Sequence, residues 1–542
     1  MKLLSRLTKP RFKAVRSQVA AAAAKQPSVS IPAEGHAELS HGEIMVIIGA
    51  LMCAMLLAAL DQTIVSTALP AIVNELHGLS QYSWVATSYL LTSAIATPLY
   101  GKISDMFGRK RIFQSAIVIF LIGSVLCGLA QDMTQLIIFR GIQGIGAGGL
   151  MTLVFAIIGD VVPPRQRGKY QGYFAAVFAV SSVAGPLLGG LFTDHLSWRW
   201  VFFINIPVGI IALAAIALRL HLPVRKSPHR VDFLGAGLLS VAISTLLLGT
   251  VWGGVEYAWT SVQIIGLFAT AVLSSLLFIW REKYAKEPII PLNLFKNKIF
   301  SVTTLLSLVI GMVMFGAIIF LPEYQQLVRG DSATKSGLML LPLVGGMMIA
   351  SVTSGRLISK HGKYRIFPIV GTAMVALAFF LFSHIALDTS RVTLGIWMFI
   401  LGAGMGQVMP VLTLAVQNAV DRKDLGAATS SVVFFRSIGS TLGAAIFGAI
   451  LTNRLAHHVA EKIPGDSGQQ ISDGLQHSAN GLTSLPADVQ HTVLTAFASS
   501  FQDVFLVAIP LALLAFLIAL FLKESPLRDS DNGESNLAES IG

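Results

Sequence analysis

One acidic residue, Asp61, lies within a predominantly apolar stretch of the chain, residues 44–72. A carboxylate at the centre of a membrane-spanning helix costs about 2.5–3.5 kcal/mol on insertion scales, so such an acid usually belongs to a functional pathway. A carboxyl group that binds and releases a proton can couple the movement of a solute to a proton gradient. We therefore predict that Asp61 couples transport to protons. The alternative is a structural carboxylate that hydrogen-bonds to its neighbours Gln62, Thr63 or Ser66.

Three further charged residues lie in or beside apolar segments. Arg140 is the expected partner of Asp61, because a buried guanidinium must find acceptors; a structural bond to backbone carbonyls is the alternative. Glu323 follows Pro322 at the end of an apolar segment, where it either supplies a second acid for a cationic substrate or is already hydrated. Arg436 has no acid in its own segment, so it either balances a charge on the substrate or bonds to a neighbouring helix.

The composition indicates a membrane protein. Of 542 residues, 54% are hydrophobic and only 12% are charged, and the mean hydropathy is +0.71, whereas a soluble chain carries about 25% charged residues. A helix needs about 20 apolar residues to cross a bilayer. The sequence therefore predicts an all-α membrane protein with fourteen transmembrane helices, at residues 44–72, 81–101, 112–131, 134–159, 171–193, 200–220, 233–253, 260–280, 299–322, 336–355, 366–386, 393–417, 427–452 and 499–522.

Lys and Arg residues are divided unequally between the two sides of this map. If the N-terminus is cytoplasmic, 31 of the 39 fall in cytoplasmic segments and six in outer loops. The positive-inside rule then predicts that both termini are cytoplasmic. Because the basic residues are divided among short loops, the net charge of +11 indicates anionic lipid headgroups, and no nucleic acid, as the partner.

Two halves of the chain repeat each other. The loops 101–111 and 355–365 each have two glycines seven residues apart, and the glycine clusters 144–148 and 402–406 are offset by 258 residues. Duplicated halves with a substrate site between them are typical of transporters. We divide the chain into a basic tail (1–42), a six-helix bundle (43–220), a linker with two extra helices (221–298), a second six-helix bundle (299–522) with an outer loop (453–498) that is either a lid or a plain connection, and a tail (523–542).

Several motifs occur in a fixed order: the stretch at Asp61, the loop 101–111, Arg140 with Gln143, Gly144 and Gly146, the group Gly185, Pro186, Gly189 and Gly190, and the segment 198–209. Together they resemble the major facilitator superfamily, specifically its fourteen-helix drug:proton antiporter branch. The resemblance covers residues 43 to 528. It implies the major facilitator fold, with two six-helix bundles and two linker helices, and it implies a role for Arg140 in proton transfer.

The resemblance also implies a gate at the inner side. Asp105, Arg109 and Asp160 are similar to the family's inner charge relay, whose ion pairs can hold the gate shut in one state and separate in the other; a static, charge-anchored loop is the alternative. Gly101 and Gly108 fit a tight turn where the bundles approach closely. Gly185, Pro186, Gly189 and Gly190 would permit close helix contact and a bend, and control of antiport direction is implied by resemblance alone.

The expected function is proton-coupled export of hydrophobic, cationic drugs across the bacterial plasma membrane by alternating access, with the proton gradient as energy source and no cofactor. The expected partners are small lipophilic molecules, protons and the lipid bilayer, and the need for a periplasmic adaptor stays open. One alternative is an exporter of a lipid or amphiphilic metabolite; another is a membrane sensor or enzyme. We expect no enzyme and no metal site, since phosphate loops and His-Glu-x-x-His motifs are absent, and His457-His458 lacks ligand spacing to a carboxylate motif.

Overall fold

The computed structural model describes residues 41–76, 81–220, 232–254, 256–331, 333–463 and 486–527. Met1–Glu43 and Ile44–Gly542 form two separate units, and of the first unit only the start of helix α2 is described. Most of the predicted tails 1–42 and 523–542, part of the linker 221–298 and the middle of the outer loop 453–498 therefore lie outside the described residues.

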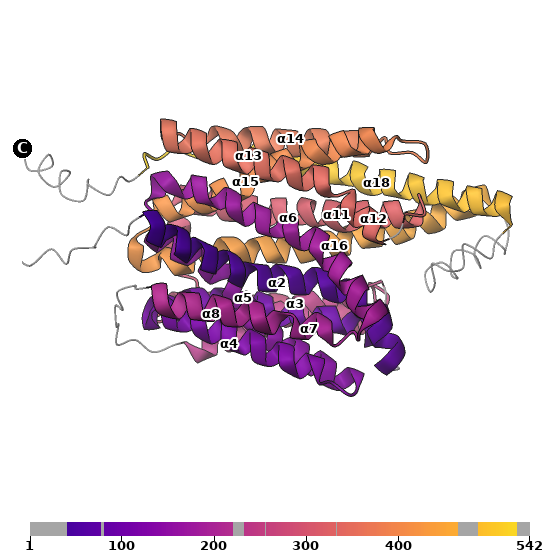
Figure 1. The fold of residues 1–542 in the computed structure, drawn as a ribbon. Helices are drawn as coiled ribbons and strands as arrows, with labels where there is room; N and C mark the ends of the chain where they lie inside the picture. Colours follow the sequence, from indigo (N-terminus) through magenta and orange to yellow (C-terminus); the bar gives the residue numbers. More distant parts are fainter. Residues whose placement is uncertain are drawn as a thin grey trace, which may run out of the picture. The chain divides into compact units, whose positions relative to one another are not determined.

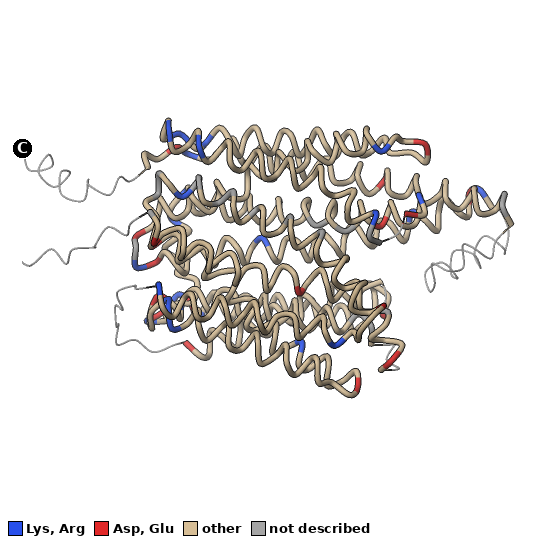
Figure 2. Tube along the Cα trace, in the orientation of Figure 1, with Lys and Arg blue, Asp and Glu red and all other residues tan. Residues whose placement is uncertain are grey.

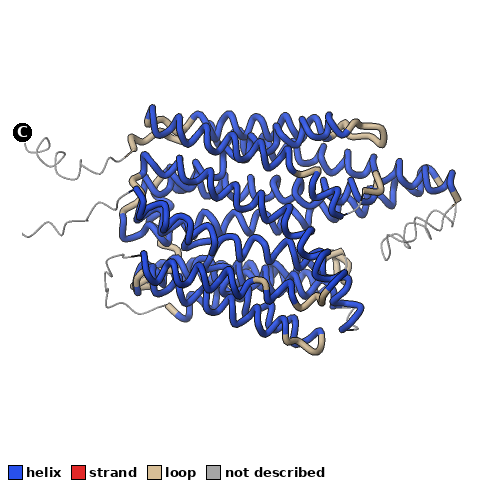
Figure 3. The backbone as a smooth tube through the Cα atoms, in the orientation of Figure 1, coloured by secondary structure: helices blue, strands red, loops and turns tan. Residues whose placement is uncertain are grey.

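Helices make up the described chain, and short loops join them (Figures 1 and 3). No β-strand occurs in the described ranges, which contain only an isolated bridge between Gly253 and Tyr257. The helices are α2 (His41–Leu76), α3 (Tyr82–Phe107), α4 (Arg109–Gly128), α5 (Met133–Val161), α6 (Pro164–His195), α7 (Trp200–Phe203), α8 (Asn205–Arg219), α9 (Phe233–Trp252), α10 (Val262–Tyr284), α11 (Lys298–Leu327), α12 (Ala333–Leu338), α13 (Leu341–His361), α14 (Ile366–Phe382), α15 (Arg391–Ala419), α16 (Leu425–Lys462) and α18 (Ala487–Leu520), with 3-10 turns at Leu292–Lys296 and Arg422–Asp424.

These helices confirm the prediction of an all-α membrane protein. Among the described residues, twelve helices are long and apolar enough to cross a membrane. Two predicted spans are not among these twelve helices. The span 81–101 corresponds to α3, and the span 366–386 corresponds to α14, which has only 17 residues. The predicted span 200–220 is divided between α7 and α8. Each predicted span thus coincides with helix, and the count of fourteen crossings stays a prediction.

The two halves repeat the same helix packing. A side chain on Gly144 of α5 would overlap the backbone of Tyr89 on α3, and one on Gly402 of α15 would overlap the backbone of Leu343 on α13. The next glycine of each cluster makes the same kind of contact with another helix: Gly146 packs against the backbone of α4, and Gly404 packs against the backbone of α14. Such small-residue contacts let membrane helices approach closely. The duplication read from the glycine spacing is therefore visible in three dimensions.

The corresponding loops also share an unusual backbone conformation. Gly108, between α3 and α4, has φ of 93°, and Gly362, which ends α13, has φ of 72°. Residues with a Cβ rarely adopt a positive φ, so glycine is needed at both turns. This explains the second glycine in each of the two repeated loops.

Charged residues gather near the ends of the helices, and long stretches without charged residues lie between them (Figure 2). In the second half, a large apolar cluster joins α11, α14, α15, α16 and α18 around fully buried aromatic residues that include Phe379, Phe382, Phe501 and Phe505. This cluster holds the helices that carry Glu323 and Arg436. Two charged residues that depart from this pattern, Asp61 of α2 and Arg140 of α5, form an ion pair at the centre of the candidate site.

Candidate functional site

Asp61 lies in the middle of α2 and is completely buried. Arg140 on α5 donates from Nη1 to Oδ2 at 2.6 Å, and Gln143, one turn further along α5, donates from Nε2 to Oδ1 at 2.7 Å. Asn205 on α8 donates to Oδ1 at 3.3 Å. The partners of this acid therefore come from two other helices, while the hydroxyl of Thr63 donates to backbone carbonyls on α2 and α6.

Arg140 is equally enclosed, with 2% of its side chain surface exposed. Besides Asp61, its guanidinium bonds to the Gln143 side-chain oxygen at 2.8 Å and to the Val85 carbonyl at 3.3 Å. The ring of Tyr89 lies 4.1 Å from its central carbon, which adds a cation–π contact. Removing one member of such a buried pair costs about 3–5 kcal/mol, because the other charge is left without compensation.

A break in the chain positions the third ligand of Asp61. The short helix α7 ends at Phe203, and α8 begins at Asn205, so the Asn205 side chain starts a helix inside the bundle. Its amide also donates to the Ser124 hydroxyl at 2.9 Å, and that hydroxyl donates to the Phe202 carbonyl at 2.9 Å. The side-chain oxygen of Asn205 is buried and has no hydrogen-bond partner among the described residues.

Sequence reasoning named Asp61 and Arg140 as partners, and the structure brings them together. It quoted Gln143 and Asn205 only as motif residues and did not place them on the acid, and it missed Tyr89 and Ser124. The spacing of three residues from Arg140 to Gln143 puts both on one face of a helix, which is the signal that could have found Gln143.

Glu323 and Arg436 are not part of this cluster. Glu323 on α11 and Arg436 on α16 are both partly exposed, and neither forms an ion pair with a described residue. The backbone of Arg436 packs against Gly311 on α11. Glu323 follows Gly311 by twelve residues, which is about 18 Å along a helix. The two charges therefore lie at different levels of the second half and do not compensate each other.

The predicted inner charge relay forms a compact network. Arg109 pairs with Asp105 at 2.9 Å and with Asp160, and it donates to the Ser104 hydroxyl at 3.0 Å. Both Arg109 and Asp105 are largely buried, whereas Asp160 at the end of α5 is partly exposed. The network ties the end of α3 to the start of α4 and the end of α5.

Asp105 also joins the two halves of the chain. Its carboxylate accepts hydrogen bonds from the backbone N–H groups of Gly426 at 3.2 Å and Ala427 at 2.9 Å, in the first turn of α16. Carboxylates bind favourably at a helix N-terminus, where the N–H groups lack partners and the helix dipole is positive. Gly101 lies close by, and a side chain there would overlap Ser430 of α16. Gly101 therefore permits the close contact of α3 with α16 that sequence reasoning expected between the bundles.

A second contact between the halves lies near this network. Arg167 on α6 donates to the Gln417 side-chain oxygen at 3.2 Å, and Gln417 on α15 donates to the Phe155 carbonyl of α5 at 2.9 Å. Both side chains are buried. Helices α5 and α6 of the first half are thus held to α15 of the second by neutral and charge-assisted hydrogen bonds.

The linker helices are attached to the same end of α3. Lys102 forms an ion pair with Glu287, just after α10, at 2.6 Å. Asp424 lies in the 3-10 turn before α16, where partial burial raises the pKa of its carboxyl group above the usual value, although the nearby charges of Lys423 and Lys102 offset part of this effect. Charged groups from the first half, the linker and the second half therefore meet at this end of the molecule.

The residues Gly185, Pro186, Gly189 and Gly190 lie in α6, which packs against α2 near Asp61. A side chain on Gly185 would overlap the Thr63 side chain, and one on Gly189 would lie 3.0 Å from the Ile64 carbonyl oxygen. A side chain on Gly190 would have no neighbouring atom within 4 Å of its Cβ. Two of the three glycines therefore allow close approach of α6 to α2, and Gly190 does not serve that contact.

We expect Gly185→Ala to lower the stability of the protein by about 1–3 kcal/mol, as overpacking does, and Gly190→Ala to leave it unchanged or slightly higher, since alanine favours helix. Thermal unfolding of the purified variants measures the difference. Gly190→Ala is the matched control, because it makes the same chemical change five residues away in the same helix. Equal unfolding temperatures for the two variants would contradict the packing described here.

Two repeated helical halves, a buried acid–base pair in one of them and a charge network joining them at one end are the features expected of a multi-pass membrane transporter. The chain belongs to the major facilitator superfamily, whose family description it matches over residues 51–444. This match makes the chain a transporter and not an enzyme, and it confirms the prediction of the superfamily and of an all-α membrane fold. The count of fourteen crossings and the proton-antiporter branch stay predictions.

Curated relatives cover most of the chain. It is 44% identical over 419 residues to the Multidrug transporter protein MdtP of Bacillus subtilis (strain 168), covering 77% of each chain. It is 38% identical over 486 residues to Multidrug resistance protein 3 of the same organism, covering 88% of this chain and 95% of the relative. An uncharacterized MFS-type transporter of Mycobacterium tuberculosis (strain ATCC 25618 / H37Rv) is 41% identical over 497 residues, with 92% of this chain and 72% of the relative covered.

Solved structures show the same fold at low sequence identity. The human organic anion transporter MFSD10 (TETRAN) has a TM-score of 0.61 at 14% identity and covers 88% of this chain and 99% of its own. The proton:xylose symporter XylE, bound to 6-bromo-6-deoxy-D-glucose, has a TM-score of 0.57 at 16% identity. The match covers 90% of this chain and 98% of the symporter. At these identities the likeness concerns the fold alone.

Proposed function

We propose that this transporter exports hydrophobic, cationic compounds across the plasma membrane in exchange for protons, with Asp61 as the acid that binds the proton. The observation that carries the proposal is the buried cluster of Asp61, Arg140, Gln143 and Asn205. The names of two relatives, a multidrug transporter and a multidrug resistance protein, support the choice of substrate.

Protonation of Asp61 changes the hydrogen bonds and the net charge of this cluster. The ionised carboxylate accepts three hydrogen bonds and neutralises Arg140. A protonated carboxyl group is neutral, so Arg140 then keeps only neutral acceptors and the Tyr89 ring. A rearrangement of α2 against α5 and α8 would let the Arg140 guanidinium find another partner for its charge. Proton binding can therefore favour one arrangement of the first half over another, which is the differential interaction that a coupled conformational change requires.

The network around Asp105 supplies the gate that a transporter also needs. Its bonds to the N-terminus of α16 exist only while α3 and α16 are in contact. We infer that this is the closed state of the inner gate and that the bonds separate when the site opens to the cytoplasm. The distribution of Lys and Arg supports placing this end of the molecule on the cytoplasmic side.

Transport into inside-out membrane vesicles tests the proposal. An imposed gradient, acidic in the lumen, should drive uptake of a fluorescent lipophilic cation, and a protonophore should abolish it. Vesicles without the protein are the control. If the protein transports no lipophilic cation under any gradient, the drug-export proposal is wrong, and lipids and amphiphilic metabolites are the next substrates to test.

We expect Glu323→Gln to raise the half-saturating concentration of a cationic substrate about tenfold, which corresponds to about 1.4 kcal/mol. Glu323 pairs with no described cation, so its charge is available to a substrate. A neutral substrate of similar size is the control and should be transported as by the wild type. An equal loss for both substrates would show that Glu323 has a structural role instead.

A second candidate function rests on Arg436. This cation forms no ion pair or hydrogen bond through its side chain with the described residues, whereas Arg140 has several partners. An unpaired guanidinium is suited to bind a carboxylate, sulfate or phosphate group on a substrate. Competition between anionic and cationic substrates, with Arg436→Gln beside the wild type, decides between the two. Selective loss of anion transport in the variant would favour this second candidate.

A further inference from the structure

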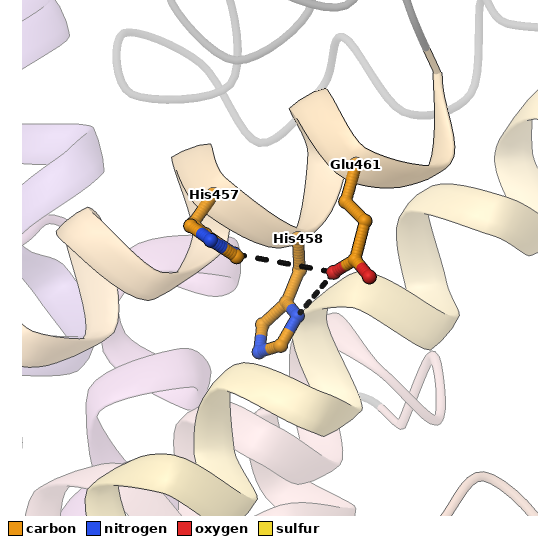
Figure 4. Close-up of side chains that lie close together, drawn as sticks. All are labelled: His457, His458 and Glu461. Carbon is orange, nitrogen blue, oxygen red and sulfur yellow. Dashed lines mark ion pairs between the residues drawn. The ribbon is translucent and has the colours of Figure 1, made fainter.

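A cluster of two histidines and a glutamate lies at the far end of α16 from the Asp105 contact, beyond the predicted span 427–452. Ring nitrogens of His457 and His458 and a carboxylate oxygen of Glu461 all lie within 4.8 Å of one another. The Nδ1 atoms of the two histidines lie 4.0 and 3.8 Å from Oε2 of Glu461 (Figure 4). Spacings of four and three residues place Glu461 next to both histidines on one side of the helix.

One of the histidines is oriented by a second helix. Nε2 of His458 lies 2.9 Å from Oδ2 of Asp503 on α18, and Arg454 lies 3.5 Å from the same oxygen. If Nε2 carries the proton and donates it to Asp503, Nδ1 is a free lone pair that faces Glu461. A metal-binding histidine almost always donates its other N–H to a carboxylate or a carbonyl, which fixes the ring and raises its basicity. His458 already has this arrangement.

The backbone that carries the cluster is anchored. Leu455 and Val459, in the same helical turns, are buried in one apolar cluster with residues of α18 that include Val493 and Phe497. The side chains of His457 and Glu461 are mostly exposed, and His458 is largely buried. The helix therefore carries one oriented, largely buried ligand next to two exposed ligands that can adjust.

We propose that His457, His458 and Glu461 form a binding site for Zn²⁺ at this end of α16, with Asp503 orienting His458. Two imidazole nitrogens and one carboxylate oxygen are typical zinc ligands, and water would complete a tetrahedral shell. Ligand atoms about 2.0–2.1 Å from zinc lie about 3.3 Å apart, so the cluster must contract by rotation of the exposed His457 and Glu461 side chains. Magnesium and calcium are disfavoured, because they prefer oxygen ligands.

Metal binding departs from what the sequence predicted. The expectation of no metal site rested on the absence of a His-Glu-x-x-His motif and of a matching carboxylate motif near His457-His458. The carboxylate here lies on the same helix as the histidines, and the orienting Asp503 lies 45 residues further along the chain from His458. That expectation stays a prediction, and the following measurement decides it.

Zinc binding should be measured by calorimetry on the purified full-length protein, carrying no histidine tag and stripped of metal. We expect one Zn²⁺ per chain, a higher unfolding temperature with zinc, and a visible spectrum typical of tetrahedral coordination when Co²⁺ replaces Zn²⁺. His457→Ala and Glu461→Gln change exposed side chains and should each weaken binding at least tenfold. Asp503→Asn keeps all three ligands and should weaken binding about 10–100-fold.

His384→Ala is the matched control. Among the described residues, the His384 side chain bonds only to Ser383 and Phe380 in its own segment, so its loss should leave zinc affinity unchanged. Every variant should unfold at the wild-type temperature in the absence of zinc, apart from Asp503→Asn, which also loses the contact with Arg454. The proposal is wrong if the wild type binds no stoichiometric zinc, or if His457→Ala and Glu461→Gln bind zinc as tightly as His384→Ala does.

Discussion

Replacing Asp61 with asparagine is expected to abolish proton-coupled transport and to destabilise the protein by about 3–5 kcal/mol, because Arg140 is left buried without a counter-ion. Arg140→Gln should do the same, since it leaves the Asp61 carboxylate without its cation. The double variant Asp61→Asn/Arg140→Gln removes both charges, and we expect it to recover most of the stability and none of the coupling. Thermal unfolding and vesicle transport measure the two effects separately.

This comparison separates a structural role of the pair from a functional one. If the double variant is stable and transports substrate against a gradient with protons as the energy source, the pair serves only the fold. If it is stable and lets substrate move only down its own gradient, Asp61 supplies the coupling. A double variant as unstable as the single ones would contradict the assignment of their instability to an uncompensated charge.

The second large effect is expected at the inner gate. Asp105→Ala removes two charge-assisted hydrogen bonds to the first turn of α16, at Gly426 and Ala427. Bonds of this kind contribute about 1.5–3 kcal/mol each, so the population of the closed state should fall by at least about 100-fold relative to the open state. A cysteine at Ser430, in a protein without Cys53 and Cys127, should then react faster with an impermeant maleimide applied from the cytoplasmic side.

Asp160→Ala is the matched control for this experiment. Asp160 bonds to the same Arg109, yet its described contacts lie within the first half and do not reach α16. It should change labelling at position 430 much less than Asp105→Ala does. Equal labelling in both variants would mean that the charge network as a whole, and not the contact of Asp105 with α16, closes this side.

Helix positions and the local part of the site were accessible to sequence reasoning for clear physical reasons. Apolar segments of sufficient length must become helices in a bilayer, because every backbone polar group needs a partner within the chain. A buried acid and a buried base in one half must be compensated, so Asp61 and Arg140 were expected to meet. The repeated glycines indicated equivalent packing, which Gly144 and Gly402 show.

Contacts between distant segments of the chain could not be predicted from the sequence in this way. Asp105 and Gly426 are separated by 321 residues, and no pattern in either segment identifies the other as its partner. The break at Ile204, which puts Asn205 on Asp61, falls within one continuous apolar stretch, so hydropathy predicts a single span there. Glu323 and Arg436 were recognised by residue type alone, and the structure adds their separation from each other but no partner within the described ranges.

Proton release on substrate binding is the most direct measurement of the central claim. Purified wild-type protein in weakly buffered detergent solution should release protons when a cationic substrate is added, with the measurement repeated over a series of pH values, and Asp61→Asn should bind the substrate without releasing any. Glu323→Gln is the control and should still release protons once its weaker binding is saturated. Undiminished proton release by Asp61→Asn would contradict the account and would place the proton site elsewhere, with Glu323 as the next residue to test.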